Sequence, residues 1–274
     1  MHPSITDLTS IEGLAKTIRR DILNLCFKTG SSHIGSSFSI VEILTALYFK
    51  SMNISPENAE SPDRDRFILS KGHGCPALYV ALHHRGFIDA AAMEGFARDG
   101  GTLEQHPTRN LRWGIECSTG SLGHGLSIGA GMSLAGKRDK RDSRVFVLLS
   151  DGETNEGSTW EAAMLAAQHK LDNLVAIVDY NKMQALGKTE EVIHLEPYAA
   201  KWESFGWSTI QVDGHNIQDL TAAFGKVPFC RGKPSCVIAH TVKGRGVCFM
   251  EGELLWHYRC PDQEEFEKAI CELD

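Results

Sequence analysis

The chain has 274 residues, which is enough for one large α/β domain or two small ones. Hydrophobic residues make up 42% and charged residues 23%, a composition that argues against disorder and against fibrous repeats. The net charge of -7 argues against broad nucleic-acid binding, which needs clustered Lys and Arg side chains to neutralise phosphates.

The sequence predicts neither a membrane span nor a disulfide framework. No apolar run approaches the roughly 20 residues that span a bilayer, and residues 1–9 lack a basic segment followed by an apolar one. The 8 cysteines are scattered without a C-x-x-C pair, which favours reduced thiols over disulfides or a zinc site. We therefore expect a cytoplasmic protein.

The first predicted elements are two helices and a strand. Apolar residues at helical spacing predict a helix over residues 11–25. A second helix is expected to begin at Ser39, because its hydroxyl and Glu42 three residues later match a capping box. The apolar run 66–70 predicts a strand, which ends in the turn 71–74 before the helical spacing resumes.

Strands and helices alternate through the rest of the chain. Residues 145–149 form a continuous apolar run, as a parallel strand covered on both faces requires. The other predicted strands cover residues 174–178, 208–212 and 235–239, and the predicted helices cover residues 126–136, 158–169, 199–205, 217–226 and 262–274. This alternation favours an α/β fold with a doubly wound, mainly parallel sheet and helices on both faces.

Two side chains that carry oxygen ligands follow neighbouring strands. Asp151 comes just after the strand at 145–149, and Asn181 just after the strand at 174–178. The carboxyl ends of parallel strands meet at one edge of a sheet, so both side chains should converge there. Their oxygens suit Mg²⁺ or Ca²⁺, which could tie a diphosphate to the protein while Gly152 allows close backbone approach. From spacing alone, a pair of ordinary strand-ending turns is the alternative.

Several histidines lie in or beside turns. They are His33, His73, His106, His124, His215 and His257. A single histidine is usually structural, whereas six in predicted loops favour binding of phosphate and hydroxyl groups and proton transfer near neutral pH. That chemistry suits a polyol or sugar phosphate. Zinc is not supported, because the sequence has no H-E-x-x-H motif and no compact His/Cys cluster.

A glycine-rich segment at residues 119–125 precedes the small-residue helix 126–136. Its glycines would let the backbone and the helix N-terminus approach a flat or anionic ligand. The segment matches neither the dinucleotide fingerprint nor a P-loop, because no strong apolar strand precedes it and no Gly-Lys-Ser/Thr follows.

Taken in order, these segments resemble the transketolase family, which depends on thiamine diphosphate, and most closely the N-terminal subunit of its split members. The matching segments are Ser32-His-Ile-Gly35, Leu69-Ser-Lys-Gly-His-Gly74, Glu104-Gln-His-Pro107, Thr119-Gly-Ser-Leu-Gly-His-Gly125, the Asp151-Gly152 to Asn181 motif, and Trp256-His257. The resemblance covers nearly the whole chain. It implies that residues 1–274 form a single diphosphate-binding domain, with the pyrimidine-binding and C-terminal domains on a separate subunit.

The resemblance also implies roles for individual residues. The metal ligands would be the side chains of Asp151 and Asn181 and the carbonyl of Met183. The residues that contact the cofactor would be His73, Gly120, Ser121, Leu122, Asp151, Gly152, Glu153, Asn181 and His257. The catalytic histidines lining the substrate channel would be His33, His73, His106 and His257. Glu156 and Glu161 would lie at a subunit interface, or alternatively on a solvated helix start.

By the same resemblance, the activity is transfer of a two-carbon ketol unit from a ketose phosphate to an aldose phosphate. Thiamine diphosphate would act as the electron sink, with Mg²⁺ or Ca²⁺ on its diphosphate. A partner C-terminal subunit would supply the catalytic glutamate in an α2β2 assembly. Three positions depart from the family pattern, since Ser150, Ser121 and His124 replace a usual Gly, Pro and Gln.

Other functions remain as alternatives. A different thiamine diphosphate reaction is one, such as 1-deoxyxylulose-5-phosphate synthesis or oxidation of a 2-keto acid. A non-catalytic binding module that keeps the fold is another. The histidine-bearing segments favour polyol substrates over the first, and the intact pair Asp151 and Asn181 speaks against the second.

Overall fold

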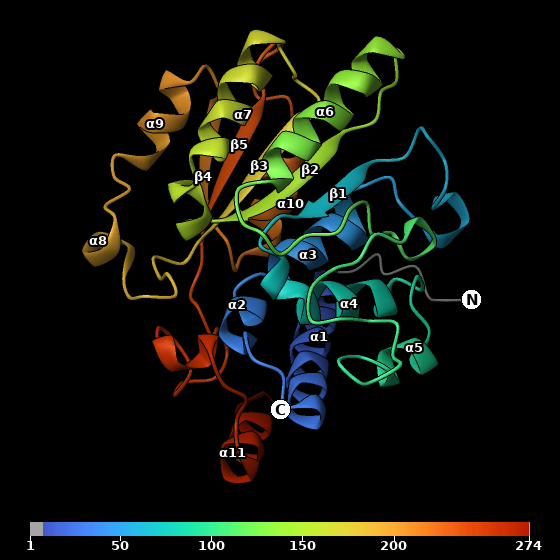
Figure 1. Ribbon diagram of the computed structural model, residues 1–274, viewed down its shortest axis with the longest axis vertical. Coiled ribbons are helices and arrows are strands. Elements are labelled where there is room, and N and C mark those ends of the chain that lie inside the picture. The colour runs from blue at the N-terminus through green and yellow to red at the C-terminus, as the bar shows by residue number, and fades with distance from the viewer. Residues whose placement is uncertain (1–7, 274) are drawn as a thin grey trace.

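The computed structural model describes residues 8–273 and centres on a parallel sheet (Figure 1). The five strands are β1 (Arg66–Leu69), β2 (Val145–Ser150), β3 (Leu174–Tyr180), β4 (Ser208–Asp213) and β5 (Ser235–His240). Their order across the sheet is β1-β2-β3-β5-β4, and every neighbouring pair is parallel. The predicted doubly wound parallel sheet is confirmed, and each strand lies where an apolar run predicts one.

The central strands are buried on both faces. All residues of β3 are buried, as the continuous apolar run required. Alternate side chains point into opposite layers: Val175 and Ile177 join one hydrophobic cluster, while Ala176 and Val178 join the other. Ser150 of β2 pairs in register with Asp179 of β3. The residues that follow these two strands therefore leave the sheet at the same edge.

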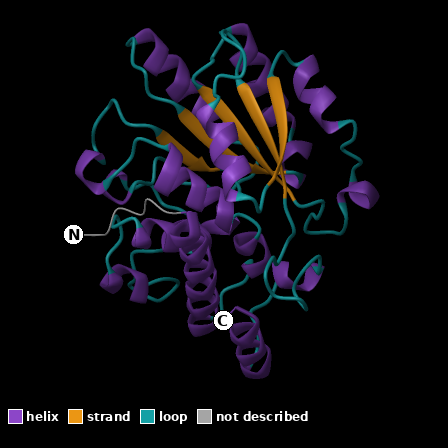
Figure 2. Cartoon of the chain, turned by 180° about the vertical axis from the view of Figure 1, so that it is seen from behind, coloured by secondary structure: helices purple, strands orange, loops and turns teal. Residues whose placement is uncertain are grey.

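Helices cover both faces of the sheet (Figures 1 and 2). One layer contains α6 (Gly125–Arg138), α7 (Gly157–Gln168) and α9 (Tyr198–Ser204). The other contains α1 (Leu8–Thr29), α3 (Val41–Ala46), α4 (Cys75–His84), α10 (Ile217–Gly225) and α11 (Gln263–Leu273). Short helices in the connections are α2 (Ile34–Phe38), α5 (Ala90–Glu94) and α8 (Thr189–Val192). The longer predicted helices are confirmed, although residue 274 lies outside the described residues.

The helix predicted to begin at Ser39 begins elsewhere. Ser39 is the C-cap residue that follows α2, and α3 starts at Val41. The Ser39 hydroxyl donates instead to the carboxylate of Asp179, at 2.7 Å. The Glu42 carboxylate likewise bonds to side chains of α1 and of the turn after β4. The capping-box prediction is wrong because partners distant in sequence bind both side chains.

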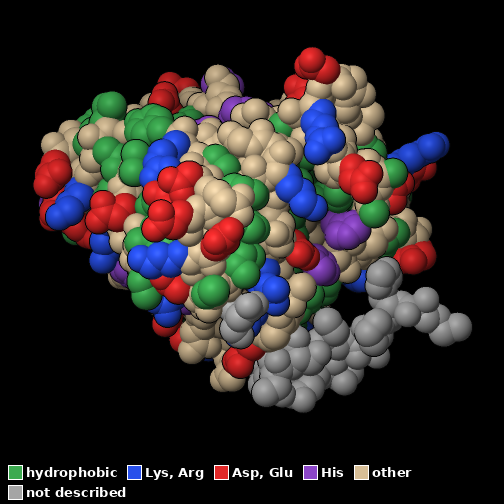
Figure 3. Space-filling model, turned by 90° about the horizontal axis from the view of Figure 1, so that it is seen from below, with side chains coloured by type: hydrophobic (Ala, Val, Ile, Leu, Met, Phe, Trp, Pro, Cys, Tyr) green, Lys and Arg blue, Asp and Glu red, His purple; other side chains and the backbone are tan. Residues whose placement is uncertain are grey.

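The surface charges are mixed and the cysteines are free, as the composition and the cysteine spacing indicate. No helix within residues 8–273 is long and apolar enough to cross a membrane. Acidic and basic side chains are interspersed on the face seen in Figure 3. All the cysteines are free, as predicted. The prediction about residues 1–9 falls mostly outside the described residues.

Gly125 marks a close approach of α6 to the end of β1. A Cβ atom on Gly125 would lie 2.2 Å from Ser70 Oγ and 2.9 Å from Ser70 Cα. We expect Gly125→Ala to lower the free energy of unfolding by about 1–3 kcal/mol, the usual cost of overpacking. Gly131→Ala on the same helix is the control: a Cβ there meets nothing within 4 Å, and the better helix former should stabilise by about 0.5–1 kcal/mol. Urea denaturation measures both, and equal effects would contradict the packing argument.

Candidate cofactor and active site

A cavity of about 410 Å³ opens at the carboxyl edge of the sheet. Among the residues predicted for the site, those that line it are His33, His73, His106, Gly120, Leu122, Gly152, Asn181, Met183 and His257. They come from loops far apart in sequence, which the parallel sheet brings together because its strands all end at this edge. Ser121, Asp151 and Glu153 do not line the cavity.

The predicted metal ligands lie around the ends of β2 and β3. The Asp151 carboxylate is buried and accepts the backbone N–H groups of Gly152 at 2.7 Å and Lys182 at 2.6 Å. Asn181 donates its amide to Asp179 at 2.9 Å, while its Oδ1 accepts the N–H of Met183 at 3.0 Å. These carboxylate, amide and carbonyl oxygens are the ligand types that Mg²⁺ and Ca²⁺ prefer.

The charge on Asp151 is not neutralised by the protein. Within residues 8–273, no Lys, Arg or His side chain forms an ion pair with it. Burial, and then repulsion from Asp179, raise the pKa of Asp151 to about 7. A nearby divalent cation would stabilise the charged carboxylate, so this donor set fits a metal-bound diphosphate.

The neighbouring carboxylate, Asp179, is already satisfied. Lys71 is fully buried, and its Nζ lies 2.5 Å from Asp179 Oδ2. Although burial acts in the opposite direction, the charge of Lys71 lowers the pKa of Asp179. Of the two buried carboxylates, Asp151 is therefore the one that lacks a cation. Among the described residues, no three or more His, Cys, Asp or Glu side chains are grouped so that they could hold a metal ion by themselves.

Four histidines form a single cluster in the cavity. The ring centroid of His33 lies 5.3 Å from that of His73, 6.4 Å from that of His106 and 4.9 Å from that of His257. Burial is the main cause that lowers the pKa of His33 to about 4 and that of His257 to about 3, and the neighbouring Lys243 and Lys71 lower both further. These two rings are therefore neutral at pH 7, and each offers one hydrogen-bond donor and one acceptor.

The other two loop histidines lie elsewhere. His124 is exposed, and its Nδ1 lies 2.9 Å from the carbonyl oxygen of Leu122. His215 packs against Glu42, outside the cavity. Chain position alone does not distinguish these two histidines from the four that cluster.

Two lysines that were not predicted from the sequence also line the cavity. Besides Lys71, the cavity contains Lys243, whose Nζ lies 3.1 Å from Nδ1 of His257. Burial, and then the charge of Lys71, lower the pKa of Lys243 to about 8. Lys71 follows β1 and Lys243 follows β5, so the rule that found Asp151 and Asn181 could have found both lysines.

Glu153 does not line the cavity but connects segments next to it. Its buried carboxylate accepts a hydrogen bond from the Ser70 hydroxyl, from the N–H of Gly123 at 2.9 Å and from the N–H of Ser150 at 3.2 Å. It therefore ties the glycine-rich segment to the ends of β1 and β2. Ser150, one of the departures, fits this arrangement because its Oγ also accepts the N–H of Glu153 at 3.1 Å.

We expect Glu153→Ala to destabilise the protein. The change leaves the buried N–H of Gly123 and the partly buried N–H of Ser150 without this acceptor, which costs up to about 1–3 kcal/mol for each group that stays unsatisfied. Chemical denaturation measures the loss. The control is Glu161→Ala, an exposed position on α7, which should change the free energy of unfolding little. A loss no larger than that of the control would contradict this role.

The two glutamates predicted at a subunit interface are both exposed, but only one of them lines the cavity. Glu156 is exposed and contributes to the cavity lining. Glu161 is exposed on α7, next to the exposed apolar residues Met164 and Leu165.

Comparison with known proteins gives consistent matches. The family model described as "Transketolase, thiamine diphosphate binding domain" matches residues 11–269. A subunit of apulose-4-phosphate transketolase from Phocaeicola vulgatus is 44% identical over 255 residues, which cover 93% of this chain and 90% of that protein. "6-deoxy-6-sulfo-D-fructose transketolase subunit SqwG" of Clostridium sp. is 42% identical over 260 residues, which cover 95% of this chain and 94% of that protein.

A solved structure agrees with the sequence relatives. Transketolase from Campylobacter jejuni matches with a TM-score of 0.90 at 26% identity, and the match covers 98% of this chain and 43% of that one. This chain thus spans less than half the length of that solved enzyme. The family model covers most of the chain, and both sequence relatives match along nearly their whole length. The chain therefore belongs to the thiamine diphosphate-binding domain family of transketolase, with thiamine diphosphate as its cofactor.

Proposed function

We propose that this protein is the cofactor-binding subunit of a split transketolase, which transfers a two-carbon ketol unit from a ketose phosphate to an aldose phosphate. The observation that carries the proposal is that the histidine cluster and the oxygen donors after β3, Asn181 and Met183, line one cavity. The names of two full-length relatives, each of them a transketolase subunit, support it.

The proposal includes a partner. We propose that the chain forms one diphosphate-binding domain and that a separate subunit supplies the pyrimidine-binding domain and a catalytic glutamate, in an α2β2 assembly. The word "subunit" in the relatives' names supports a partner. The free cysteines support a reducing, cytoplasmic location.

The proposed metal site uses the oxygen donors at the edge of the sheet. In this proposal, Asp151, Asn181 and the Met183 carbonyl hold Mg²⁺ or Ca²⁺ against the diphosphate. When bound, thiamine diphosphate supplies the electron sink for breaking and making the carbon–carbon bond. The Lys243 ammonium faces the same cavity, where it would offset part of the negative charge of the diphosphate.

The remaining predicted contacts surround the cofactor. Gly152, Gly120 and Leu122 line the cavity from the loops after β2 and before α6, where they would pack against the cofactor. His73 lines it beside His257, with ring centroids 5.4 Å apart, and both rings would bind polar groups of the cofactor or substrate.

The histidines would bind substrate hydroxyls and move protons at their ring nitrogens. His33 supports this role because it adopts a left-handed backbone conformation, with φ of 68°, which is costly for a residue other than glycine. Its N–H donates to the carbonyl of His257 at 3.2 Å, so the backbone holds the two residues together. The lowered pKa values keep both rings neutral and able to accept a proton at neutral pH.

The test is reconstitution of the two-subunit enzyme. The chain is purified alone and with the candidate partner subunit of the same organism, then assayed with thiamine diphosphate and Mg²⁺. Donors include apulose 4-phosphate and 6-deoxy-6-sulfo-D-fructose, the sugars in the relatives' names, and common ketose phosphates. We expect ketol transfer with at least one donor, and only when both subunits are present.

Two results would overturn the proposal. One is no transfer with any donor in a complex that binds the cofactor. The other is formation of 1-deoxyxylulose 5-phosphate from pyruvate and an aldose phosphate without ketol transfer, which would favour the alternative enzyme.

A further inference from the structure

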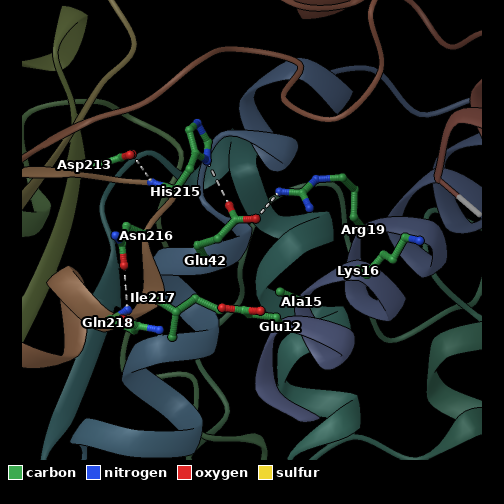
Figure 4. Close-up of a pocket in the computed structure, with 10 residues that line it drawn as sticks. All are labelled: Glu12, Ala15, Lys16, Arg19, Glu42, Asp213, His215, Asn216, Ile217 and Gln218. Atoms are coloured by element: carbon green, nitrogen blue, oxygen red, sulfur yellow. Dashed lines mark hydrogen bonds and ion pairs between the residues drawn. The ribbon is translucent and has the colours of Figure 1, made fainter. Parts of the chain in front are cut away.

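We propose that His215 is a positioning residue that holds the segment after β5, in which Thr241 bonds to Asp179 and Lys243 lines the cofactor cavity. The inference rests on the proposed function of that site. Its starting point is a second crevice, of about 540 Å³, lined by residues of α1, α3 and the turn between β4 and α10 (Figure 4). His215 lies at this crevice and not in the cofactor cavity.

The contacts of His215 determine which ring nitrogen carries the proton. The side chain is 10% exposed, and its Nε2 accepts the backbone N–H of Val242 at 2.8 Å. A neutral imidazole that accepts at Nε2 carries its proton on Nδ1. Nδ1 lies 2.9 Å from the Glu42 carboxylate and can donate to it. The bond to Val242 thus requires the neutral ring, and the bond to Glu42 selects the required tautomer.

Glu42 is itself held from the other side. Its second carboxylate oxygen lies 2.5 Å from the guanidinium of Arg19 on α1, and both side chains are about nine-tenths buried. Figure 4 shows the three side chains in sequence, from Arg19 through Glu42 to His215. A line of buried polar contacts therefore runs from α1 to the backbone after β5.

Val242 lies between Thr241, which bonds to Asp179, and Lys243, which lines the cofactor cavity. The Thr241 hydroxyl donates to Asp179, the carboxylate that also holds the amide of Asn181. On the other side, Lys243 extends into the cavity and contacts His257. The hydrogen bond at Val242 therefore positions a contact to Asp179, which holds the proposed metal ligand Asn181, on one side and a contact to His257 of the histidine cluster on the other.

The turn that carries His215 is shaped for this contact. The N–H of Gly214 donates to the carbonyl of His240 at 2.8 Å. A Cβ atom on Gly214 would lie 2.4 Å from Cγ2 of Thr241, so the turn approaches the end of β5 more closely than a larger residue allows. This packing is an observation independent of the ring contacts, and it places the turn against the same segment.

The variants separate the two bonds of the ring. His215→Leu removes both bonds. His215→Asn keeps a donor near the position of Nδ1 but is too short to reach Val242, whereas His215→Gln offers an acceptor close to the position of Nε2. Exposed His169, at the end of α7, is the control site, as His169→Leu. If the Leu variant does not fold, comparison of the Asn and Gln variants still tests whether the bond to Val242 matters.

The first measurement is amide hydrogen exchange at Val242 in the full chain without cofactor. We expect exchange to be roughly 5- to 100-fold faster in the Leu and Asn variants, because a partly buried N–H loses its acceptor. The Gln variant and the His169 control should exchange like the wild type. Unchanged exchange in both the Leu and the Asn variants would overturn the positioning role.

The second measurement is thiamine diphosphate affinity with Mg²⁺ in the assembled complex. We expect Kd to rise about 10- to 100-fold in the Leu and Asn variants, the range found for outer-shell partners of metal sites, with rescue by Gln. At saturating cofactor, kcat should stay near wild type. Faster exchange with unchanged Kd would overturn the link to the cofactor site. Failure of the proposed function gives a different result. In that case the wild-type complex shows no ketol transfer, while amide exchange at Val242 is still faster in the Leu and Asn variants.

Discussion

Replacing Asp151 with alanine should abolish Mg²⁺-dependent binding of thiamine diphosphate, with a loss of affinity of at least about 100-fold. Asp151 is a buried carboxylate that forms no ion pair among the described residues, whereas its neighbour Asp179 is already paired with Lys71. A divalent cation between this carboxylate and the diphosphate supplies the missing charge, so removing the carboxylate removes the attachment. Calorimetry on the assembled complex, with and without Mg²⁺, measures the effect.

The control must separate loss of the metal from loss of the fold. The Asp151 carboxylate also accepts the N–H groups of Gly152 and Lys182, so alanine leaves both without this acceptor. Asp151→Asn keeps an acceptor for one of them and should lose cofactor affinity to the same extent. Asp99→Ala, at an exposed loop position, should bind normally. Mg²⁺-dependent binding that survives in a folded Asn variant would remove Asp151 from the metal site.

Replacing His33 with glutamine should lower kcat/KM for ketol transfer about 10²- to 10⁴-fold, while leaving cofactor affinity near wild type. The ring of His33 is the member of the cluster within 6.4 Å of each of the other three, and its backbone is held in a strained conformation. Glutamine keeps hydrogen-bonding capacity but cannot take up a proton at neutral pH. Steady-state kinetics of the reconstituted enzyme measures the loss, and His84→Gln on α4 is the control.

The same site predicts a particular pH dependence. Burial lowers the pKa of His33 to about 4 and that of His257 to about 3, so both rings stay neutral from pH 8 down to pH 5. They gain a proton only as the pH falls through these values, and they then lose the ability to accept one. The decline in log kcat/KM from these groups should therefore lie near pH 4. A wild-type decline centred on the ordinary histidine value of 6.5, absent in His33→Gln, would contradict the neutral cluster.

Local pattern predicted the scaffold and part of the site. The apolar runs at 145–149 and 174–178 identified β2 and β3 because strands buried on both faces need continuous apolar residues. Once the sheet is parallel, residues just after the strands must meet at one edge, so the convergence of Asp151 and Asn181 followed from chain order. Lys71 and Lys243 obey the same rule and were missed because a lysine after a strand is usually solvated.

Long-range contacts account for the errors. Ser39 and Glu42 match a capping box in sequence, yet one bonds to Asp179 and the other to Arg19 and His215. The contact of Glu153 with the cofactor stays a prediction; in the structure its carboxylate accepts hydrogen bonds from the Ser70 hydroxyl and from the N–H groups of Gly123 and Ser150. The partners of Ser39 and Glu42 lie 23 to 173 residues away along the chain, which no local pattern contains.

The sequence by itself determined the order of elements, the parallel sheet and the edge at which the polar residues collect. Local apolar periodicity predicts which segments are buried strands and helices, and the ends of parallel strands meet at one edge. Only the tertiary structure decided which of the loop histidines share the cavity and which carboxylate lacks a cation. His33 and His215 look alike in sequence, since each follows or adjoins a glycine-containing turn. Their neighbours in space make one a member of a neutral cluster in the cavity and the other a buried support of the segment after β5.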